Sequence, residues 1–303
     1  MHVLALLIAG NIQVGRVRHY GPMRQNGERG PHCGALIAYN RGRRVGKMNI
    51  VIANDRAELG KFVATQAAEV LTNRLAEKDE CNIVVATGSS QFEVLDGLVQ
   101  QPGIDWKRVN GFHLDEYIGL ESTHPASFCG YLAKRFVERV PLKSFFFLDG
   151  TKDPQDLVAE ASEAIGGKTI DLLLCGIGEN CHLAFNDPPA DFETENPYLV
   201  VDLDEACRRQ QVGEGWFDSF EQVPTQAISM SVNQILAAEQ ILCSVPDRRK
   251  AEAVSLTVEA PIEPVAPATA LRNHKNTTLI LDKSSGSQLS DQSLQMVRHL
   301  NNV

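Results

Sequence analysis

The segment TIDLLLCGIGENCHLAFND, residues 169–187, decides the fold of this chain. Its first part, 169–178, is the most continuous apolar run and is typical of a central strand buried on both faces of a parallel sheet. Gly176 and Gly178 permit a tight turn directly after that strand. Polar side chains crowd into the residues that follow, and ligands of such sheets bind outside the carboxyl ends of the strands.

The alternation of short apolar runs with amphipathic stretches extends in both directions from this strand. It predicts an α/β fold with a single doubly wound, mostly parallel sheet and helices on both faces. Strands are expected at 49–53, 82–86, 109–114, 144–149, 169–178, 227–232, 239–245 and 277–282, and helices at 55–77, 91–101, 126–139, 154–165, 247–258 and 268–273. A long polar stretch, 186–224, interrupts the pattern.

The pattern divides the chain into three parts. Residues 1–47 hold seven Arg and one Lys against a single acid, Glu28, without any regular period, and we expect an unpacked basic extension. A translation start placed too far upstream is the interpretation we favour, and a disordered basic arm or a targeting signal are the alternatives. Residues 48–283 are predicted to form one domain, and 284–303 a polar tail.

Composition excludes several classes of protein. The chain has 303 residues, of which 43% are hydrophobic, and a net charge of −9, which argues against a nucleic-acid partner. No apolar stretch approaches the roughly 20 residues of a membrane helix, so we expect no membrane partner. Seven Cys without a CxxC pair favour reduced, buried thiols in a cytoplasmic protein. The sequence does not determine the oligomeric state, and a homo-oligomer is possible.

Two segments could bind an anion. ATGSS (86–90) leaves a strand and opens a helix, where free N–H groups and hydroxyls favour a phosphate; the residues concerned are Thr87, Gly88, Ser89 and Ser90. An ordinary strand–turn–helix with Ser caps is the alternative. In DRRK (247–250), cations at a helix start oppose the helix dipole unless an anion binds, and we expect Lys250 to be the contact. A solvated helix start is the alternative there.

Two further segments could carry acid–base chemistry. In HLDEYIG (113–119), Asp115 and Glu116 follow a strand directly, so one could act as a base while the other is structural. A solvated acidic turn is the alternative. After the central strand, Asn180, His182 and Asp187 form a general acid–base arrangement, although a lone His is often structural. Their spacing matches neither a metal site nor the GxGxxG of a dinucleotide site.

From Met48 to about Asp282, these segments resemble, in the same order, the glucosamine-6-phosphate deaminase (isomerase) family, a branch of the fold shared with 6-phosphogluconolactonase. ATGSS resembles its phosphate loop. LDEYIGL followed by HPASF resembles its DEY segment, and GIGENCHLAFND resembles its GIGxxGHIAFNEP signature. Residues 223–254 resemble its run from VP to KAxA. The third and fourth matches are long and specific.

The resemblance implies a role for each matching residue. Asp115 matches the base that moves a proton between C2 and C1 of the open-chain sugar, and His182 the residue that opens the pyranose ring. Asn180 and Asp187 match the residues that orient and relay with that His. The phosphate contacts are matched by Gly88, Ser89 and Lys250. The implied enzyme of amino-sugar metabolism, a hydrolase of a C–N bond, converts glucosamine 6-phosphate to fructose 6-phosphate and ammonia without a cofactor or metal.

The sequence departs from the family's pattern at several positions. Cys181 replaces a Gly, Asp187 a Glu, and Gln91 a frequent Pro. Over 190–217 the family's Arg-rich segment has no clear counterpart, and Gly215 stands where an Arg clamps the phosphate. Arg208 or Arg209 could supply the missing guanidinium from an earlier turn, and Arg209 is our candidate.

Two other functions share this fold. The first is a 6-phosphogluconolactonase-type hydrolase, against which the AFND and DEY segments argue. The second is a non-catalytic sugar-phosphate sensor, which in bacterial regulators carries an added helix-turn-helix. Residues 1–47 show no helix pair, so we favour the deaminase.

Overall fold

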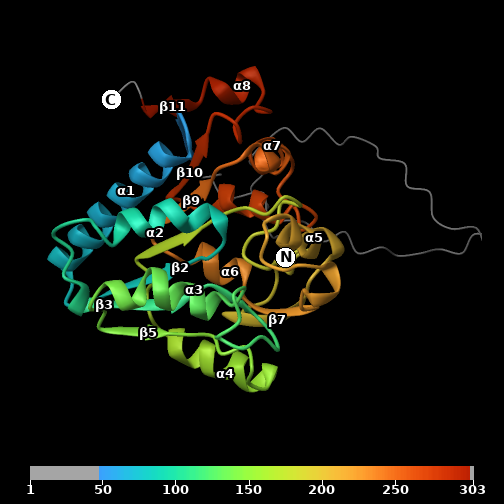
Figure 1. Ribbon diagram of the computed structural model, residues 1–303. Helices are drawn as coiled ribbons and strands as arrows, with labels where there is room; N and C mark the ends of the chain where they lie inside the picture. The colour runs from blue at the N-terminus through green and yellow to red at the C-terminus, as the bar shows by residue number, and fades with distance from the viewer. Residues whose placement is uncertain (1–47, 301–303) are drawn as a thin grey trace, which may run out of the picture. The chain divides into compact units, whose positions relative to one another are not determined.

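An eight-stranded sheet is the centre of the computed structural model, which describes residues 48–300 (Figure 1). Every neighbouring pair in it is parallel, which confirms the predicted α/β fold class with its large parallel sheet. In spatial order the strands are β11 (Val297–His299), β1 (Asn49–Ala53), β10 (Thr277–Asp282), β9 (Ile241–Val245), β6 (Leu172–Cys175), β2 (Cys81–Val85), β3 (Val109–His113) and β5 (Ser144–Phe146).

Helices cover both faces of this sheet. One hydrophobic cluster takes side chains from α1 (Arg56–Glu77), α2 (Phe92–Leu98) and α3 (Phe128–Arg135). The cluster on the other face takes them from α4 (Pro154–Ile165), α6 (Val232–Leu236) and α7 (Ala251–Glu259). The prediction of a doubly wound sheet is therefore confirmed.

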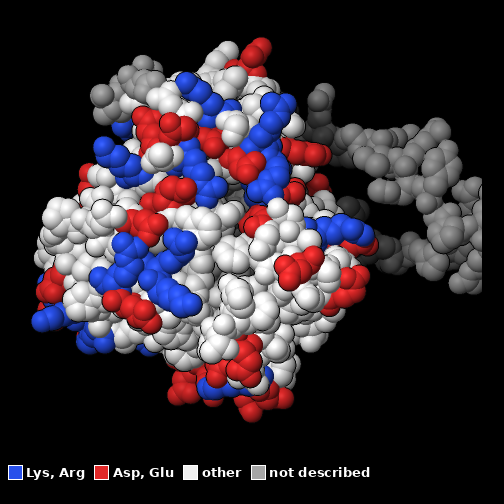
Figure 2. All heavy atoms as spheres, in the orientation of Figure 1, with Lys and Arg blue, Asp and Glu red and all other residues white. Residues whose placement is uncertain are grey.

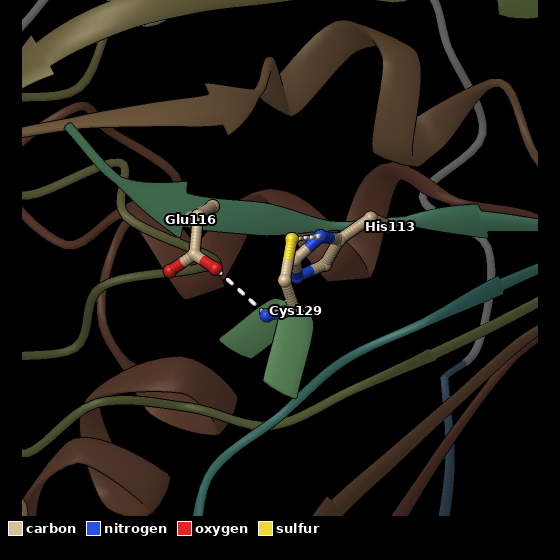
Figure 3. A group of neighbouring side chains, drawn as sticks. All are labelled: His113, Glu116 and Cys129. Atoms are coloured by element: carbon tan, nitrogen blue, oxygen red, sulfur yellow. Dashed lines mark hydrogen bonds between the residues drawn. The ribbon is translucent and has the colours of Figure 1, made fainter. Parts of the chain in front are cut away.

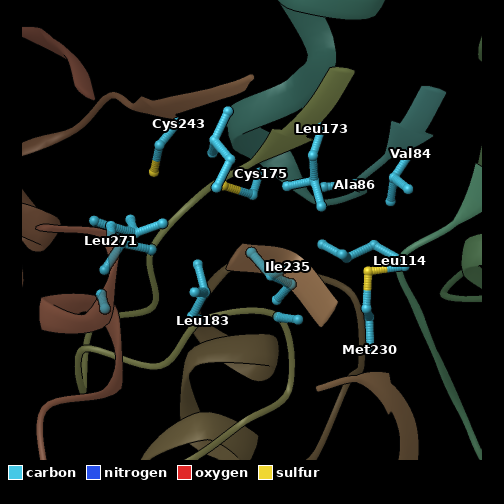
Figure 4. Close-up of a cluster of buried hydrophobic side chains, with 14 of the residues drawn as sticks. Val84, Ala86, Leu114, Leu173, Cys175, Leu183, Met230, Ile235, Cys243 and Leu271 are labelled. Carbon is cyan, nitrogen blue, oxygen red and sulfur yellow. The ribbon is translucent and has the colours of Figure 1, made fainter. Parts of the chain in front are cut away.

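The strands supply both clusters because side chains alternate along extended backbone. In β6, Leu173 and Cys175 pack into the cluster drawn in Figure 4, whereas Leu172 and Leu174 pack into the opposite one. All four side chains are buried, so this strand is covered on both faces as its continuous apolar sequence predicts. Burying a Leu side chain contributes roughly 1.5–3 kcal/mol, so the leucines of this strand stabilise the centre of the sheet.

A second, three-stranded antiparallel sheet was not predicted. It joins β4 (Asp115–Tyr117), β8 (Gln226–Met230) and β7 (Tyr198–Asp202), in that order. The expectation of a single sheet that included 227–232 was therefore wrong. The chain passes between the sheets at Leu114, whose N–H donates to Val85 of β2 and whose carbonyl accepts from Met230 of β8.

The stretch 186–224 contributes regular structure in spite of its polar sequence. It contains β7 and α5 (Glu205–Gly213), which begins after the N-cap Asp204. The apolar residues of this region do not follow a simple period, because they form an aromatic cluster with the small sheet; its members include Tyr117, Phe128, Phe185 and Phe217.

The predicted helices begin and end close to where the sequence places them. Asp55 caps α1 by accepting from the N–H of Glu58. Tight 3-10 turns replace the ends of three other predicted helices, at Ser89–Gln91, Val137–Arg139 and Arg248–Lys250. The 3-10 turn Pro267–Asn273 replaces the whole of the helix predicted at 268–273.

The segment predicted as a polar tail also joins the fold. It holds α8 (Asp291–Leu294), and β11 pairs in parallel with β1 at one edge of the main sheet. Part of the segment predicted as a polar tail is therefore regular structure. The predicted basic extension, residues 1–47, lies outside the described residues.

The surface carries charges of both signs. Figure 2 shows Lys and Arg interspersed with Asp and Glu over one face, and pairs such as Arg135 with Asp96 lie 3.3 Å apart. Such mixing weakens long-range fields of either sign. Among residues 48–300, no helix is both long enough and apolar enough to cross a bilayer.

Candidate active site

A pocket lies at the carboxyl ends of the central strands. The chain leaves β2 toward β3 and β5 and returns through β6, so the loops after β2 and β6 diverge and leave room for a ligand. The pocket is lined by residues that follow β2, β6 and β9, together with parts of β4 and α5; they include Thr87, Gly88, Ser89, Ser90, Asp115, Gly178, His182, Gln210, Glu214 and Lys250. Segments far apart in sequence therefore meet as the sequence predicts.

Asp115 reaches this pocket because β4 leaves the main sheet after Leu114. Its side chain is buried, and its Oδ1 has no hydrogen-bond partner among the described residues. Burial, and then the charge of Glu116, raise the pKa of Asp115 to about 8. Once ionised, a carboxylate of this kind, unpaired and poorly solvated, can take a proton from a bound carbon acid.

Glu116 turns away from the pocket, because successive side chains of a strand point in opposite directions. Its carboxylate accepts from the N–H groups of Phe128 (3.2 Å) and Cys129 (2.7 Å) at the start of α3, from the Ser127 hydroxyl and from the Tyr117 N–H. Burial raises the pKa of Glu116, and these four bonds oppose the rise. The geometry thus gives the two adjacent carboxylates different roles, with Glu116 as the structural one.

His113, Glu116 and Cys129 form a buried group with metal-ligand chemistry (Figure 3). The hydrogen bonds of its atoms favour a structural role. Glu116 already accepts four hydrogen bonds, the Cys129 thiol donates to the Leu148 carbonyl at 2.9 Å, and His113 Nδ1 accepts from the Leu148 N–H at 3.3 Å. Burial lowers the pKa of His113 to about 3, so the ring is neutral.

His182 lies on the loop after β6 and lines the same pocket as Asp115. Its Nδ1 is 3.1 Å from Oδ1 of Asp187, and its backbone N–H donates to Oδ1 of Asn180 at 3.2 Å. Gly178 makes this possible, because a Cβ there would come within 2.3 Å of the imidazole ring.

Asn180 and Asp187 are themselves held in place. The Asn180 amide donates to Asp187 at 2.9 Å and to Asp204, the N-cap of α5, at 3.0 Å. Asp187 also accepts from the Asp204 N–H. Burial alone would raise the pKa of Asp187, but His182 and these bonds lower it, so the carboxylate stays ionised beside the ring.

Cys181, which stands where the family that the sequence resembles has a Gly, has a φ of +70°. This is the left-handed region, which costs a residue with a Cβ about 1–2 kcal/mol. The side chain is buried against Thr257, with the sulfur 3.5 Å from the hydroxyl. It therefore points into the core and does not enter the pocket, whose loop keeps the conformation that a Gly would adopt.

A second group of residues in the pocket lining suits an anion. Gly88, with a φ of +88°, carries no side chain at the point where the loop turns toward the 3-10 turn Ser89–Gln91. The buried Thr87 hydroxyl has no partner among the described residues. Lys250 is buried, with its Nζ 3.4 Å from Glu214, and burial lowers its pKa while the charge of Glu214 opposes the change. Ser90 also lines the pocket.

Arg209 does not reach this pocket, which corrects its assignment as a phosphate contact. It is exposed on α5 and pairs with Glu205 one turn earlier. Arg208 donates to the Phe220 and Val223 carbonyls instead. Both side chains lie away from the pocket, because Gln210, Gln211 and Glu214 occupy the helix face toward it.

The pocket lining contains further polar residues that were not predicted as site residues. Arg56 lies just after β1, pairs with Glu93 at 2.8 Å and donates to the Ser89 carbonyl. Arg249 precedes Lys250 and pairs with Asp247. The position of both at strand ends could have indicated them. Gln210 and Glu214 lie in the stretch without a regular pattern, where the sequence gives no such signal.

Comparisons with a family model and with curated proteins point to the same family. A family model described as "Glucosamine-6-phosphate isomerases/6-phosphogluconolactonase" matches residues 54–280. The glucosamine-6-phosphate deaminase of Bacillus pumilus is 32% identical over 250 residues, which are 79% of this chain and 99% of that protein. That of Clostridium acetobutylicum is 31% identical over 249 residues, covering 80% and 100% of the two chains.

Solved structures of a deaminase and of a lactonase share the fold of this chain. A monomeric glucosamine-6-phosphate deaminase has a TM-score of 0.72 at 28% identity and covers 79% of this chain and 99% of its own. The 6-phosphogluconolactonase from Trypanosoma brucei has a TM-score of 0.66 at 17% identity, with coverage of 81% and 100%. At that lower identity the likeness extends to the fold alone.

Proposed function

The chain belongs to the family of glucosamine-6-phosphate isomerases and 6-phosphogluconolactonases, and we propose that it converts glucosamine 6-phosphate and water to fructose 6-phosphate and ammonia. The observation that carries the proposal is that Asp115 and His182 line one pocket, in a chain whose similar curated proteins are named deaminases. The similarity to lactonase structures rests on the fold alone, so it favours no second function.

Ring opening comes first in the proposed reaction. The hydrogen on C2 is only weakly acidic until a carbonyl forms at C1, so the pyranose must open before that proton can leave. His182 would move a proton between the C1 hydroxyl and the ring oxygen. Asp187, ionised and 3.1 Å from Nδ1, would orient the ring for this transfer, and Asn180 accepts from the backbone N–H of His182.

Asp115 would then act as the base. It removes the C2 proton from the open-chain amino aldehyde, and the electron pair moves into an enolamine. Return of the proton to C1 leaves an imine at C2, which water hydrolyses to the ketone with release of ammonia. Because water enters as the C–N bond breaks, we place the enzyme among the hydrolases of C–N bonds. The free Oδ1 of Asp115 and its raised pKa suit this role.

The phosphate would bind the second group of pocket residues, which we call the anion end of the pocket. Backbone N–H groups of the loop at Gly88, the hydroxyls of Thr87, Ser89 and Ser90, and the Lys250 ammonium are the groups that would hold it. Anchoring one end of a flexible open-chain sugar positions its C1 and C2 near the acid–base groups, which reduces the entropy lost on reaching the transition state.

Cysteine burial supports a reducing compartment. Six cysteines among residues 48–300 are free and buried, with no disulfide between them. We infer a cytoplasmic enzyme from this thiol content, as is usual for proteins that keep buried cysteines reduced.

The decisive experiment uses Asp115→Asn. The wild-type protein should release ammonia and fructose 6-phosphate in equal amounts from glucosamine 6-phosphate, and the variant should lose this activity by about 10²–10⁴-fold, as for the loss of a general base. Asp105→Asn, at an exposed position outside the pocket, is the matched control and should retain activity. Absence of ammonia with wild-type protein, or an active Asp115→Asn, would contradict the proposal.

A further inference from the structure

A glutamate occupies the anion end of the pocket. α5 ends in a tight turn, in which the Gly215 N–H donates to the Val212 carbonyl and the Trp216 N–H to the Gln211 carbonyl. Gly215 has a φ of +81°, which completes a Schellman motif at the helix end. This turn sets Glu214, the residue before Gly215, against the loop at Ser89 and beside Lys250.

Four donors converge on the Glu214 carboxylate. The Ser89 hydroxyl donates at 3.1 Å and the Trp216 indole N–H at 3.3 Å to one oxygen. The Gln210 amide at 2.8 Å and the Lys250 ammonium at 3.4 Å reach the other. A carboxylate has about four lone-pair sites, so its hydrogen-bonding capacity is filled. Two of these donors, Ser89 and Lys250, are groups that would hold a phosphate.

The charges at this end are balanced before any ligand binds. The side chains of Glu214 and Lys250 are only 5% and 8% exposed, so their pairing is poorly screened by water. Burial would raise the pKa of Glu214, but Lys250 and the other donors lower it, and the carboxylate is ionised. The other cations lining the pocket, Arg56 and Arg249, already pair with Glu93 and Asp247. A phosphate dianion would therefore meet a fixed negative charge at close range.

We propose that Glu214 is a specificity-determining residue, which competes with the substrate's phosphate for Lys250 and Ser89 and so weakens the binding of phosphorylated ligands. This inference rests on the proposed function, because that function places the phosphate at this end of the pocket. The carboxylate acts as an internal anion that the phosphate must displace. Its presence lowers the advantage that a phosphorylated amino sugar has over the unphosphorylated one.

Calorimetric titration of the full chain with inorganic phosphate at about pH 8, where phosphate is mostly dianionic, tests the proposal. Glu214→Gln removes the charge at nearly constant size and should bind phosphate at least about tenfold more tightly than the wild type. Glu205→Gln, an exposed glutamate of the same helix, should not differ from the wild type. Adding Lys250→Met to Glu214→Gln should abolish the gain, which places the phosphate at this site.

Affinity that is unchanged or weaker in Glu214→Gln would overturn the proposal and make Glu214 a positioning residue for Lys250. Glu214→Ala, whose missing side chain leaves space open to the pocket, repeats the test should the Gln variant fail to fold. Kinetics give the second readout: the KM for glucosamine 6-phosphate should fall about tenfold in Glu214→Gln, whereas that for glucosamine should not fall. Tighter phosphate binding by a protein that releases no ammonia would contradict the proposed reaction but not the role of Glu214.

Discussion

Asp115 and Glu116 are consecutive residues whose surroundings give them opposite properties. Glu116 is surrounded by four donors, whereas Oδ1 of Asp115 has none among the described residues. Because burial is the larger cause and the Glu116 charge the second, the pKa of Asp115 rises to about 8. At neutral pH much of the free enzyme would then hold Asp115 protonated, and only the ionised form can act as a base.

The raised pKa of Asp115 determines how activity should depend on pH. We expect kcat/KM for glucosamine 6-phosphate to rise about tenfold per pH unit below about pH 8 and to level off above it, since kcat/KM reports the free enzyme. Glu116→Gln removes the neighbouring charge and should move the rise of kcat/KM to lower pH. A rise caused by ionisation of the substrate would stay at the same pH in this variant. A kcat/KM that is flat between about pH 6 and 8 would contradict the assignment.

The place of single residues after strand ends could be predicted from the sequence. The direction of side chains on α5, a helix without a regular apolar period, could not. Asp115, His182 and Lys250 follow apolar strands, and the carboxyl ends of those strands meet, so their convergence follows from the fold class. Arg209 was assigned without knowledge of where α5 begins. Neighbouring residues of a helix point about 100° apart, so Gln210 lines the pocket while Arg209 beside it lies in solvent.

At the scale of elements, α3 is tied to the strand that carries Asp115. Its first N–H groups would lack partners within the helix, and Glu116 accepts from two of them while Ser127 caps a third. A buried carboxylate thus joins β4 to the start of α3 and fixes the backbone of Asp115.

Glu116→Ala should therefore destabilise the domain strongly. It leaves three buried N–H groups and a hydroxyl without their acceptor, and we expect the free energy of unfolding to fall by about 2–4 kcal/mol, as measured by urea denaturation. Glu121→Ala, at an exposed position of the same connection, is the control and should change stability by less than about 0.5 kcal/mol. Equal stability of the two variants would show that other groups hold α3.

Elements with regular periods were predictable, and those that pack through aromatic side chains were not. Strands such as β6 and β10 and helices such as α1 follow their sequence patterns. The small sheet and α5 were missed, because Tyr117, Phe185 and Phe217 meet from three distant segments. Such a cluster has no sequence period, because its members come from segments that are far apart in the chain.

At the scale of the whole molecule, alternation of strands and helices predicts the kind of sheet but not the order of its strands. The pocket needs the divergence of the chain between β2 and β6, which depends on that order. The edge strand β11 is an element that the sequence pattern does not predict. Its sequence, VRH, is short and polar, and only its pairing with β1 makes it a strand.

Removal of β11 should separate stability from activity. A chain that ends at Gln295 loses three backbone pairings with β1 and the packing of Val297 and Leu300, and it exposes the edge of β1. We expect its melting temperature to fall by about 2–8 °C, corresponding to roughly 1–2 kcal/mol, and heated samples to aggregate more readily because an unpaired edge can recruit other strands. The pocket lies at the central strands, so kcat/KM at room temperature should stay within about twofold of the wild type. Loss of activity in a protein that remains folded would mean that the edge strand is coupled to the pocket, and an unchanged melting temperature would mean that β11 adds nothing to the sheet.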